Sequence, residues 1–260
     1  MDAFAERVAR RFELDAPEAA FLEKLQANRQ RVERGRILVA EGDRADHAFV
    51  LVSGWAMSGT HFPDGTQQVR RLHFPGDLLA MPSLPLRRHA ESLEAISDAI
   101  VAPFPKDALA DLFTMPRLAA IMFMFAQMER VAAGDRLASL GHDSAKSRLA
   151  FFLVDILNRL RSTDPTVTDS FHMHLSREQV AHVIGTTAVH ASRMWSALLS
   201  QGLIRTTGRS VKVIDEVELA RLGHFTDRDG DLDHAWLEGV ERRLAFGAAS
   251  VPQGWPKRKQ

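Results

Sequence analysis

The chain has 260 residues, of which 45% are apolar, so it can form two domains with cores of their own. It contains no cysteine, which excludes disulfides, thiolate zinc sites, iron–sulfur clusters and thiol redox sensing. Its 33 basic residues balance 33 acidic ones, and no apolar run approaches the ~20 residues of a membrane span. With no signal peptide at its start, we expect a cytoplasmic protein without a membrane partner.

The first half of the chain predicts a helical arm followed by a β-barrel. We expect the arm over residues 1–20 and the barrel over 21–112. Between Ile37 and Phe104, short apolar runs with a period of two are separated by Gly, Asp and Pro. Asp64-Gly65 is a hairpin signal, and residues 74–77 mark another corner. Several short strands at this spacing predict a small barrel or jelly roll.

Residues 113–141 predict one long helix that joins two copies of the chain. Pro116 suits its first turn, and apolar residues then recur at 3-4-3-4 spacing. We expect this seam to pack against its copy in a homodimer. Its members are Leu118, Ile121, Phe125, Met128 and Ala132. The same Met- and Phe-rich run leaves a cofactor pocket open as an alternative.

Residues 142–222 predict a winged helix-turn-helix domain. Ser176 and Thr187 are N-caps of two short helices, and Gly185 lies in the turn between them. Residues 203–207 and 210–214 are two short strands with a turn at Gly208-Arg209, which form the wing. The second helix is expected to enter the major groove. A helical hairpin packed inside some other domain is the alternative.

The charge pattern of this region supports DNA binding. No Asp or Glu occurs between Gln179 and Ile214, whereas Arg193, Arg205, Arg209 and Lys212 do. A carboxylate here would repel the phosphate backbone, so its absence favours a DNA-facing surface. The remaining residues, 223–260, are an extension that is most helical over Asp233–Phe246, with a disordered end over 256–260.

The order of these motifs resembles the CRP/FNR superfamily of bacterial transcription regulators. The residues that carry the resemblance are Gly42-Asp43, Phe49–Gly54, Asp64-Gly65, Phe74–Ala80 and Leu175–Ile204. It implies an α+β chain with a jelly-roll barrel like a cyclic-nucleotide-binding domain, a long dimerisation helix and a C-terminal winged helix-turn-helix. It also implies a homodimer that binds an inverted-repeat operator in double-stranded DNA, and RNA polymerase as a further partner.

In that family the recognition helix presents Glu, Ser or Gly, and Arg to base edges. Ser192 and Arg193 match the last two, but Val189 occupies the Glu position, so the usual half-site does not transfer and His190 becomes the polar reader. Ser176, Arg177 and Thr187 lie at helix beginnings and match family positions that bind phosphate. The expected DNA-binding residues are Ser176, Arg177, Thr187, Ala188, Val189, His190, Ser192, Arg193, Arg209 and Lys212.

The nucleotide contacts of the family are missing from this chain. Met81 occupies the position of the ribose-holding Glu, His89-Ala90 that of the Arg-Ser pair, and Ala132-Ala133 that of the helix hydroxyls. A buried cyclic phosphate without a cation is costly, so we expect DNA binding without cAMP. Another effector remains an alternative, since Arg87, Arg88 and His89 form a basic segment. The corresponding pocket residues are Gly76, Asp77, Leu79, Ala80, Met81, Arg88 and His89.

Other chemistries find less support. His172 and His174 with Glu178 form an incomplete metal set. The acidic run over residues 227–233 has Leu232 at the position where a calcium loop requires glycine. Haem is the remaining cofactor, but the spacing of the histidines singles out none of them as its ligand. The barrel sequence also lacks the two histidines and a carboxylate that a cupin-like enzyme would need. The histidines concerned are His47, His61, His73 and His89. We therefore expect no cofactor, no metal and no enzymatic activity. A third alternative is a ligand-binding module that does not bind DNA. It would require a winged helix that has lost its function, and the helix caps and arginines of this region argue against that.

Overall fold

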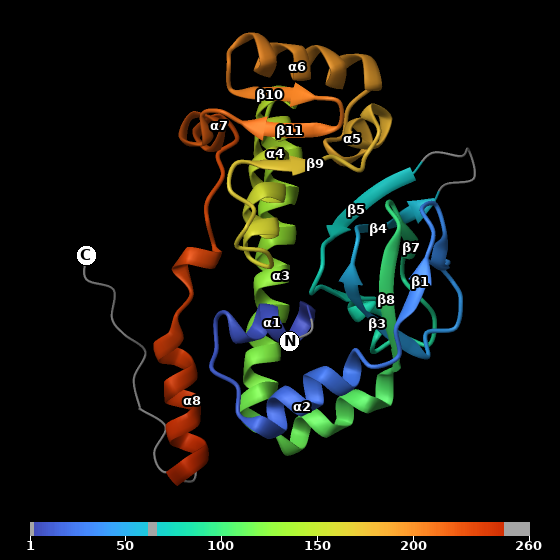
Figure 1. Cartoon of the computed structure of the whole chain (residues 1–260), viewed down its shortest axis with the longest axis vertical. Helices are drawn as coiled ribbons and strands as arrows, with labels where there is room; N and C mark the ends of the chain where they lie inside the picture. Colours follow the sequence, from blue (N-terminus) through green and yellow to red (C-terminus); the bar gives the residue numbers. More distant parts are fainter. Residues whose placement is uncertain (1–2, 62–66, 247–260) are drawn as a thin grey trace. The chain divides into compact units, whose positions relative to one another are not determined.

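The computed structural model describes residues 3–61 and 67–246 (Figure 1). The chain divides into two compact units, of which the first comprises residues 1–108 and 134–226 and the second residues 109–133 and 227–260. The expected Asp64-Gly65 turn and the 256–260 tail lie outside the described residues. No helix in the described part of the chain is long and apolar enough to cross a membrane.

Two helices precede the barrel. The first is α1 (Ala3–Ala9), and the second is α2 (Ala16–Leu25). Asp15 begins α2 with a capping box, since its carboxylate accepts from the Glu18 amide and the Glu18 carboxylate accepts from the Asp15 amide. The helical arm thus reaches residue 25, five residues beyond the predicted boundary.

The barrel consists of two four-stranded antiparallel sheets, with strand orders β1-β8-β3-β6 and β2-β7-β4-β5. Gly54, with a φ of +80°, connects β3 to β4 where an added Cβ would lie 2.3 Å from the Asp98 carbonyl oxygen. The two sheets confirm the predicted jelly-roll barrel. The strands are β1 (Gln30–Val32), β2 (Ile37–Val39), β3 (His47–Ser53), β4 (Ala56–His61), β5 (Gln67–His73), β6 (Leu78–Leu79), β7 (Ser92–Ala95) and β8 (Ala99–Pro105).

Helical segments follow the barrel. Two 3-10 segments, η1 (Met81–Ser83) and η2 (Lys106–Thr114), lie before the long helix α3 (Pro116–His142). Helix α4 (Ala145–Arg161) begins after Ser144, whose hydroxyl caps it by accepting from the Ser147 amide.

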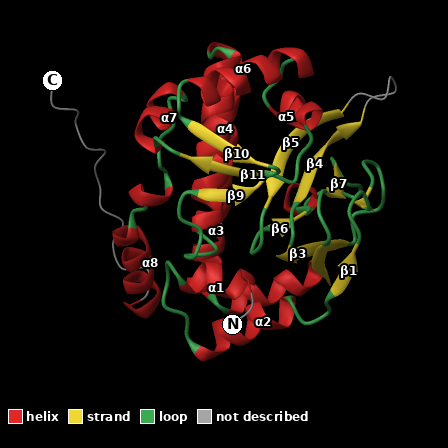
Figure 2. Cartoon of the chain, turned by 45° about the horizontal axis from the view of Figure 1, so that its top comes forward, coloured by secondary structure: helices red, strands yellow, loops and turns green. Residues whose placement is uncertain are grey.

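The winged helix-turn-helix follows the prediction closely. It contains β9 (Ser170–His172), α5 (Arg177–Val183), α6 (Ala188–Ser200), β10 (Ile204–Thr207), β11 (Ser210–Val213) and α7 (Glu216–Leu222). The strands form one antiparallel sheet in the order β10-β11-β9, drawn beside α6 in Figure 2. Between α5 and α6, Gly185 adopts a φ of +62°, a conformation that glycine tolerates without strain.

One hydrophobic core extends from the barrel into the winged helix-turn-helix. Trp55 and Phe74 of the barrel share a buried cluster with Leu149 and Leu153 of α4. The ring centroids of Trp55 and Phe74 are 4.6 Å apart, and those of Trp55 and Phe171 in β9 are 6.4 Å apart. Because these two regions bury common apolar surface, each stabilises the other.

The C-terminal extension forms η3 (Asp229–Asp231) and α8 (His234–Phe246). The Asp227 carboxylate accepts from the Asp229 amide, and the Asp233 carboxylate caps α8 by accepting from the Trp236 amide. The acidic run therefore caps local helical turns, and α8 agrees with the predicted helix.

Candidate nucleic-acid interface

Helix α6 has one buried face and one exposed face. Ala191, Trp195 and Leu198 are buried at helical spacing. The opposite face contains the residues predicted to meet DNA, which are Ala188, Val189, His190, Ser192 and Arg193, and all five are exposed. Val189 is 64% exposed, so an apolar side chain occupies the centre of this polar surface. A branched apolar group in this place suits contact with a thymine methyl.

Arg193 has no hydrogen-bond or ion-pair partner among the described residues, and the same holds for Arg205 at the start of the wing. A guanidinium presents five donors in a planar fork, which matches two acceptors of guanine or of a phosphate. Arg193 extends from the helix that is expected in the groove, whereas Arg205 extends from the wing. Both therefore keep their donors available for a ligand.

The two predicted phosphate-binding hydroxyls have structural roles as N-caps. The Ser176 hydroxyl accepts from the Gln179 amide at 3.1 Å, and the Thr187 hydroxyl accepts from the His190 amide at 3.3 Å. Each hydroxyl still has its hydrogen to donate. Capping thus orients these groups at the helix N-termini, where anions are favoured.

Arg177, the third predicted phosphate contact at a helix beginning, stacks on an aromatic ring. Its guanidinium carbon lies 3.5 Å from the centroid of the Trp195 ring in α6. This cation–π contact links the first turn of α5 to α6 and restricts the guanidinium to one position.

The wing departs from the acid-free surface that the sequence predicts. Lys212 lies 2.9 Å from the Asp169 carboxylate, which precedes β9 and so falls outside the acid-free window. Arg209 donates to the His174 carbonyl oxygen at 3.3 Å. The Asp169 carboxylate consequently neutralises part of the charge of Lys212, which weakens the predicted role of Lys212 as a free phosphate contact.

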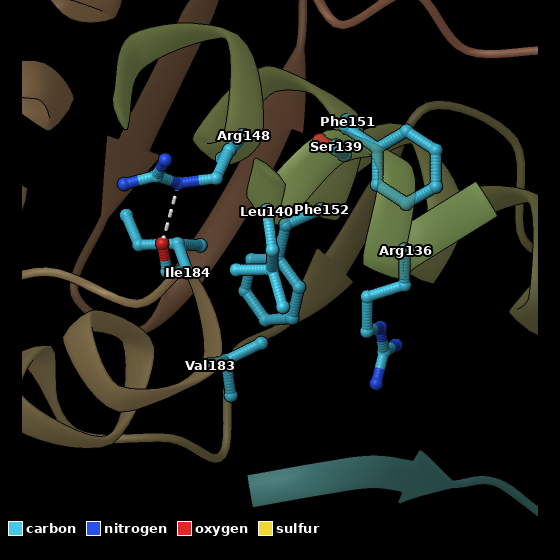
Figure 3. Close-up of a pocket in the computed structure, with 8 residues that line it drawn as sticks. All are labelled: Arg136, Ser139, Leu140, Arg148, Phe151, Phe152, Val183 and Ile184. Atoms are coloured by element: carbon cyan, nitrogen blue, oxygen red, sulfur yellow. Dashed lines mark hydrogen bonds between the residues drawn. The ribbon is translucent and has the colours of Figure 1, made fainter. Parts of the chain in front are cut away.

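Sequence reasoning missed Arg148, which fixes the turn between the two helices (Figure 3). Its guanidinium donates to the carbonyl oxygens of Ile184 at 2.6 Å, Asp143 at 2.9 Å and Gly185 at 3.2 Å. Ile184 and Gly185 follow α5 and lie 36 and 37 positions from Arg148, so no local signal could reveal these two partners. The adjoining hollow of about 20 Å³ has room for a single water.

His172 and His174 come together as predicted, with ring centroids 4.7 Å apart. Burial, followed by His172, Arg34 and Arg209, lowers the pKa of His174 from 6.5 to about 4. Within residues 3–61 and 67–246, no group of three His, Asp or Glu side chains has the arrangement of a metal site. His174 contacts Trp55 instead, and the two ring centroids are 5.0 Å apart.

The predicted effector-pocket residue Asp77 belongs to a buried ion cluster, and Gly76 lies beside it, which corrects that prediction. Asp77 is 2% exposed and bonds to Arg7 of α1, to Arg71 at 3.4 Å and to Arg159 of α4 at 2.8 Å. A Cβ on Gly76 would meet the Ala3 carbonyl oxygen at 2.9 Å. Their surroundings are thus protein, because partners distant in sequence cover them.

The three arginines stabilise the charged form of Asp77 strongly. Although burial alone raises the pKa of this carboxyl, Arg7, Arg71 and Arg159 together hold it far below its usual range. Arg159 also donates to the Leu72 carbonyl oxygen at 3.0 Å and lies 4.6 Å from the Phe74 ring centroid. One carboxylate therefore links the N-terminal helix, the barrel and α4.

The remaining pocket residues divide between the barrel interior and its surface. Leu79, Ala80 and His89 are buried, Met81 is half-buried and Arg88 is exposed, with its guanidinium on the Gly42 carbonyl oxygen at 2.7 Å. Burial lowers the pKa of His89 and raises that of the nearby Glu91, so both favour their neutral forms. Such an interior offers little to a phosphate.

The predicted dimer seam is only partly available to a partner. Leu118 and Ile121 are fully buried within the single chain, Phe125 and Met128 are half-buried, and Ala132 is exposed. The exposed apolar side chains of α3 are instead Phe123, Val131 and Leu137, with Phe123 about 200° around the helix from Ile121. The sequence predicted the helix from its apolar spacing. Because α3 has apolar side chains on two faces, the spacing alone does not show which face would contact a second copy of the chain.

Two family models match this chain in the same order as its domains. The cyclic nucleotide-binding domain matches residues 29–115, and the Crp-like helix-turn-helix domain matches residues 147–222. The chain belongs to the CRP/FNR superfamily of transcription regulators. Helix α8 lies beyond the matched residues of this regulator.

Curated relatives of this regulator are transcription regulators as well. It is 27% identical over 210 residues to the transcriptional regulatory protein btr of Bordetella pertussis, covering 80% of this chain and 86% of the relative. It is 24% identical to the fumarate and nitrate reduction regulatory protein of Escherichia coli, covering 83% and 86%. The structure of FixK2 from Bradyrhizobium japonicum has the same fold, with a TM-score of 0.67, 24% identity and coverage of 75% and 96%.

Proposed function

We propose that this CRP/FNR regulator binds an inverted-repeat operator as a homodimer, and that it does so without a cyclic nucleotide. The observation that carries the proposal is the exposed face of α6, where Arg193 has no partner within the described chain. Ser192 precedes it on the same helix. Together they offer a hydroxyl and a guanidinium to base edges.

The independence from cyclic nucleotide rests on the barrel. The positions that hold ribose and phosphate in nucleotide-binding members of the family are occupied by Met81, His89 and Ala90. His89 is buried and favours its neutral form, so it supplies no cation for a cyclic phosphate. A ligand without differential contacts cannot shift the balance between active and inactive forms, which leaves cAMP little effect.

Dimerisation is supported by the exposed apolar side chains of α3. Val131 and Leu137 are 45% and 71% exposed in the single chain. Large exposed apolar groups on a long helix are typical of a surface that packs against a partner. Two recognition helices related by a two-fold axis then meet half-sites about one DNA turn, ~34 Å, apart.

The test is selection of bound sequences from a randomised DNA library by nucleotide-free protein, followed by mobility shifts. We expect an enriched inverted repeat that differs from the usual family half-site at the base facing Val189. Enrichment of no sequence, or of a single half-site bound by a monomer, would contradict the proposal.

A further inference from the structure

We infer that a groove between α3 and α8 binds a small, flat, cationic molecule. The inference goes beyond the proposed function and does not depend on it. The groove has a volume of about 270 Å³ and is lined by Phe123, Met124 and Met128 of α3 and by Leu232, Asp233 and Trp236 of the extension, with the Gln127 amide as its other polar group. All of these residues belong to the second unit of the chain.

The groove has walls that are held in place by their own contacts. Arg117 in α3 forms an ion pair with Glu241 in α8 at 2.5 Å, and Leu237 of α8 is 5% exposed. The Asp233 carboxylate caps α8 by accepting from the Trp236 amide at 3.2 Å. The helix that carries Trp236 is thus fixed at its beginning and along its length, as a pre-formed site requires.

The two aromatic rings suit a flat ligand. The centroids of Phe123 and Trp236 are 6.4 Å apart, and their planes are inclined by 31°. Both side chains remain substantially exposed, at 55% and 42%, although they face each other. Since stacked carbons contact at ~3.5 Å, a third flat ring needs about 7 Å between two others. A small adjustment of either side chain therefore admits an aromatic ligand between them.

The charge of the lining selects a cation. Asp233 is the charged residue of the groove, and no Lys, Arg or His side chain that the structure describes contributes to the lining. Trp and Phe faces attract cations through their ring quadrupoles, and the methionine sulfurs add polarisable contacts. An anion would meet the Asp233 carboxylate without a compensating cation, so the groove discriminates by charge as well as by shape.

The experiment is calorimetric titration of the full chain with three probes of similar shape, namely 1-methylquinolinium, 1-methylnaphthalene and 1-naphthoate. We expect the cation to bind about tenfold more tightly than the neutral probe, and the anion to bind weakest. Equal affinities for the three probes, or no binding of any probe up to millimolar concentration, would overturn the inference.

Variants locate the site. Asp233→Asn keeps a good helix cap but removes the charge, so it should lose most of the preference for the cation while the neutral probe binds as before. Asp231→Asn removes one charge two residues away, outside the lining, and should change neither probe. Trp236→Leu should weaken the cationic and neutral probes severalfold, with Trp236→Phe restoring part of the affinity. An Asp233→Asn variant with an undiminished preference for the cation would place the site elsewhere.

Discussion

Two arginines of the winged helix-turn-helix region differ in what surrounds them. Arg159 of α4 bonds to the Asp77 carboxylate and the Leu72 carbonyl oxygen and lies against the Phe74 ring. Arg193 of α6 is exposed and has no partner among the described residues. Arg159 therefore stabilises the folded chain through its internal contacts. Arg193 lies on the exposed face of α6 and keeps its donors free for a ligand.

The comparison separates stability from recognition. Removing a member of the Asp77 cluster should damage folding, whereas removing Arg193 should change DNA binding and leave folding intact.

Asp77→Ala should lower the free energy of unfolding by about 3–5 kcal/mol, measured by urea denaturation. The substitution leaves Arg7, Arg71 and Arg159 close together without their shared counter-charge. Asp46→Ala removes an exposed carboxylate from the Arg44 pair and should cost less than ~1 kcal/mol. Similar losses for the two variants would show that the buried cluster contributes no special stability.

Leu137→Glu should raise the dimer dissociation constant about a hundredfold, measured by sedimentation. The side chain is 71% exposed in the single chain, and two carboxylates would face each other if it lies in the dimer seam. Val217→Glu introduces the same charge at an exposed apolar position on α7 and should leave the constant unchanged. A dimer indifferent to Leu137→Glu would exclude this part of α3 from the seam.

Arg193→Ala should cost about 1–3 kcal/mol at the selected operator and relax the choice of one base. Arg205→Ala removes an equally unpartnered guanidinium from the wing and should weaken specific and random DNA to a similar extent. Filter binding or anisotropy with both DNAs gives the two specificity ratios. An unchanged ratio for Arg193→Ala would remove this residue from the base readers.

Stability should fall as the pH is lowered from about 6.5 to about 4, and His174 should account for part of this loss. Its pKa is lowered from 6.5 to about 4, so in this window the unfolded chain takes up a proton that the folded chain refuses. His174→Gln should flatten the profile by less than ~2 kcal/mol, because the ring is part-exposed. His47→Gln, at an exposed barrel residue, should leave the profile unchanged. If both variants retain the wild-type slope, another group causes the loss.

The predictable parts of this fold are those specified by neighbouring residues. The Ser176 cap with Gln179, the Thr187 cap and the glycine turn lie within a few positions of one another, and the structure has them where the sequence predicts. The barrel follows from strand periodicity and turns in the same manner.

The less predictable parts depend on contacts between distant residues. Arg159 reaches Asp77 from 82 positions away, so a residue expected in a pocket belongs to an ion cluster instead. The Asp169 partner of Lys212 lies just before β9, 43 positions earlier in the chain, and changes the expected wing surface. Helix α3 has apolar residues around most of its circumference, and only the fold determines which of them, such as Leu118, are already covered.

The most direct test of the central claim is the affinity of nucleotide-free protein for its selected operator, measured by fluorescence anisotropy with and without a saturating concentration of cAMP. We expect tight, sequence-specific binding with the same dissociation constant in both samples, because the barrel offers the cyclic phosphate no cation. Protein that ignores its operator until cAMP is added would contradict it.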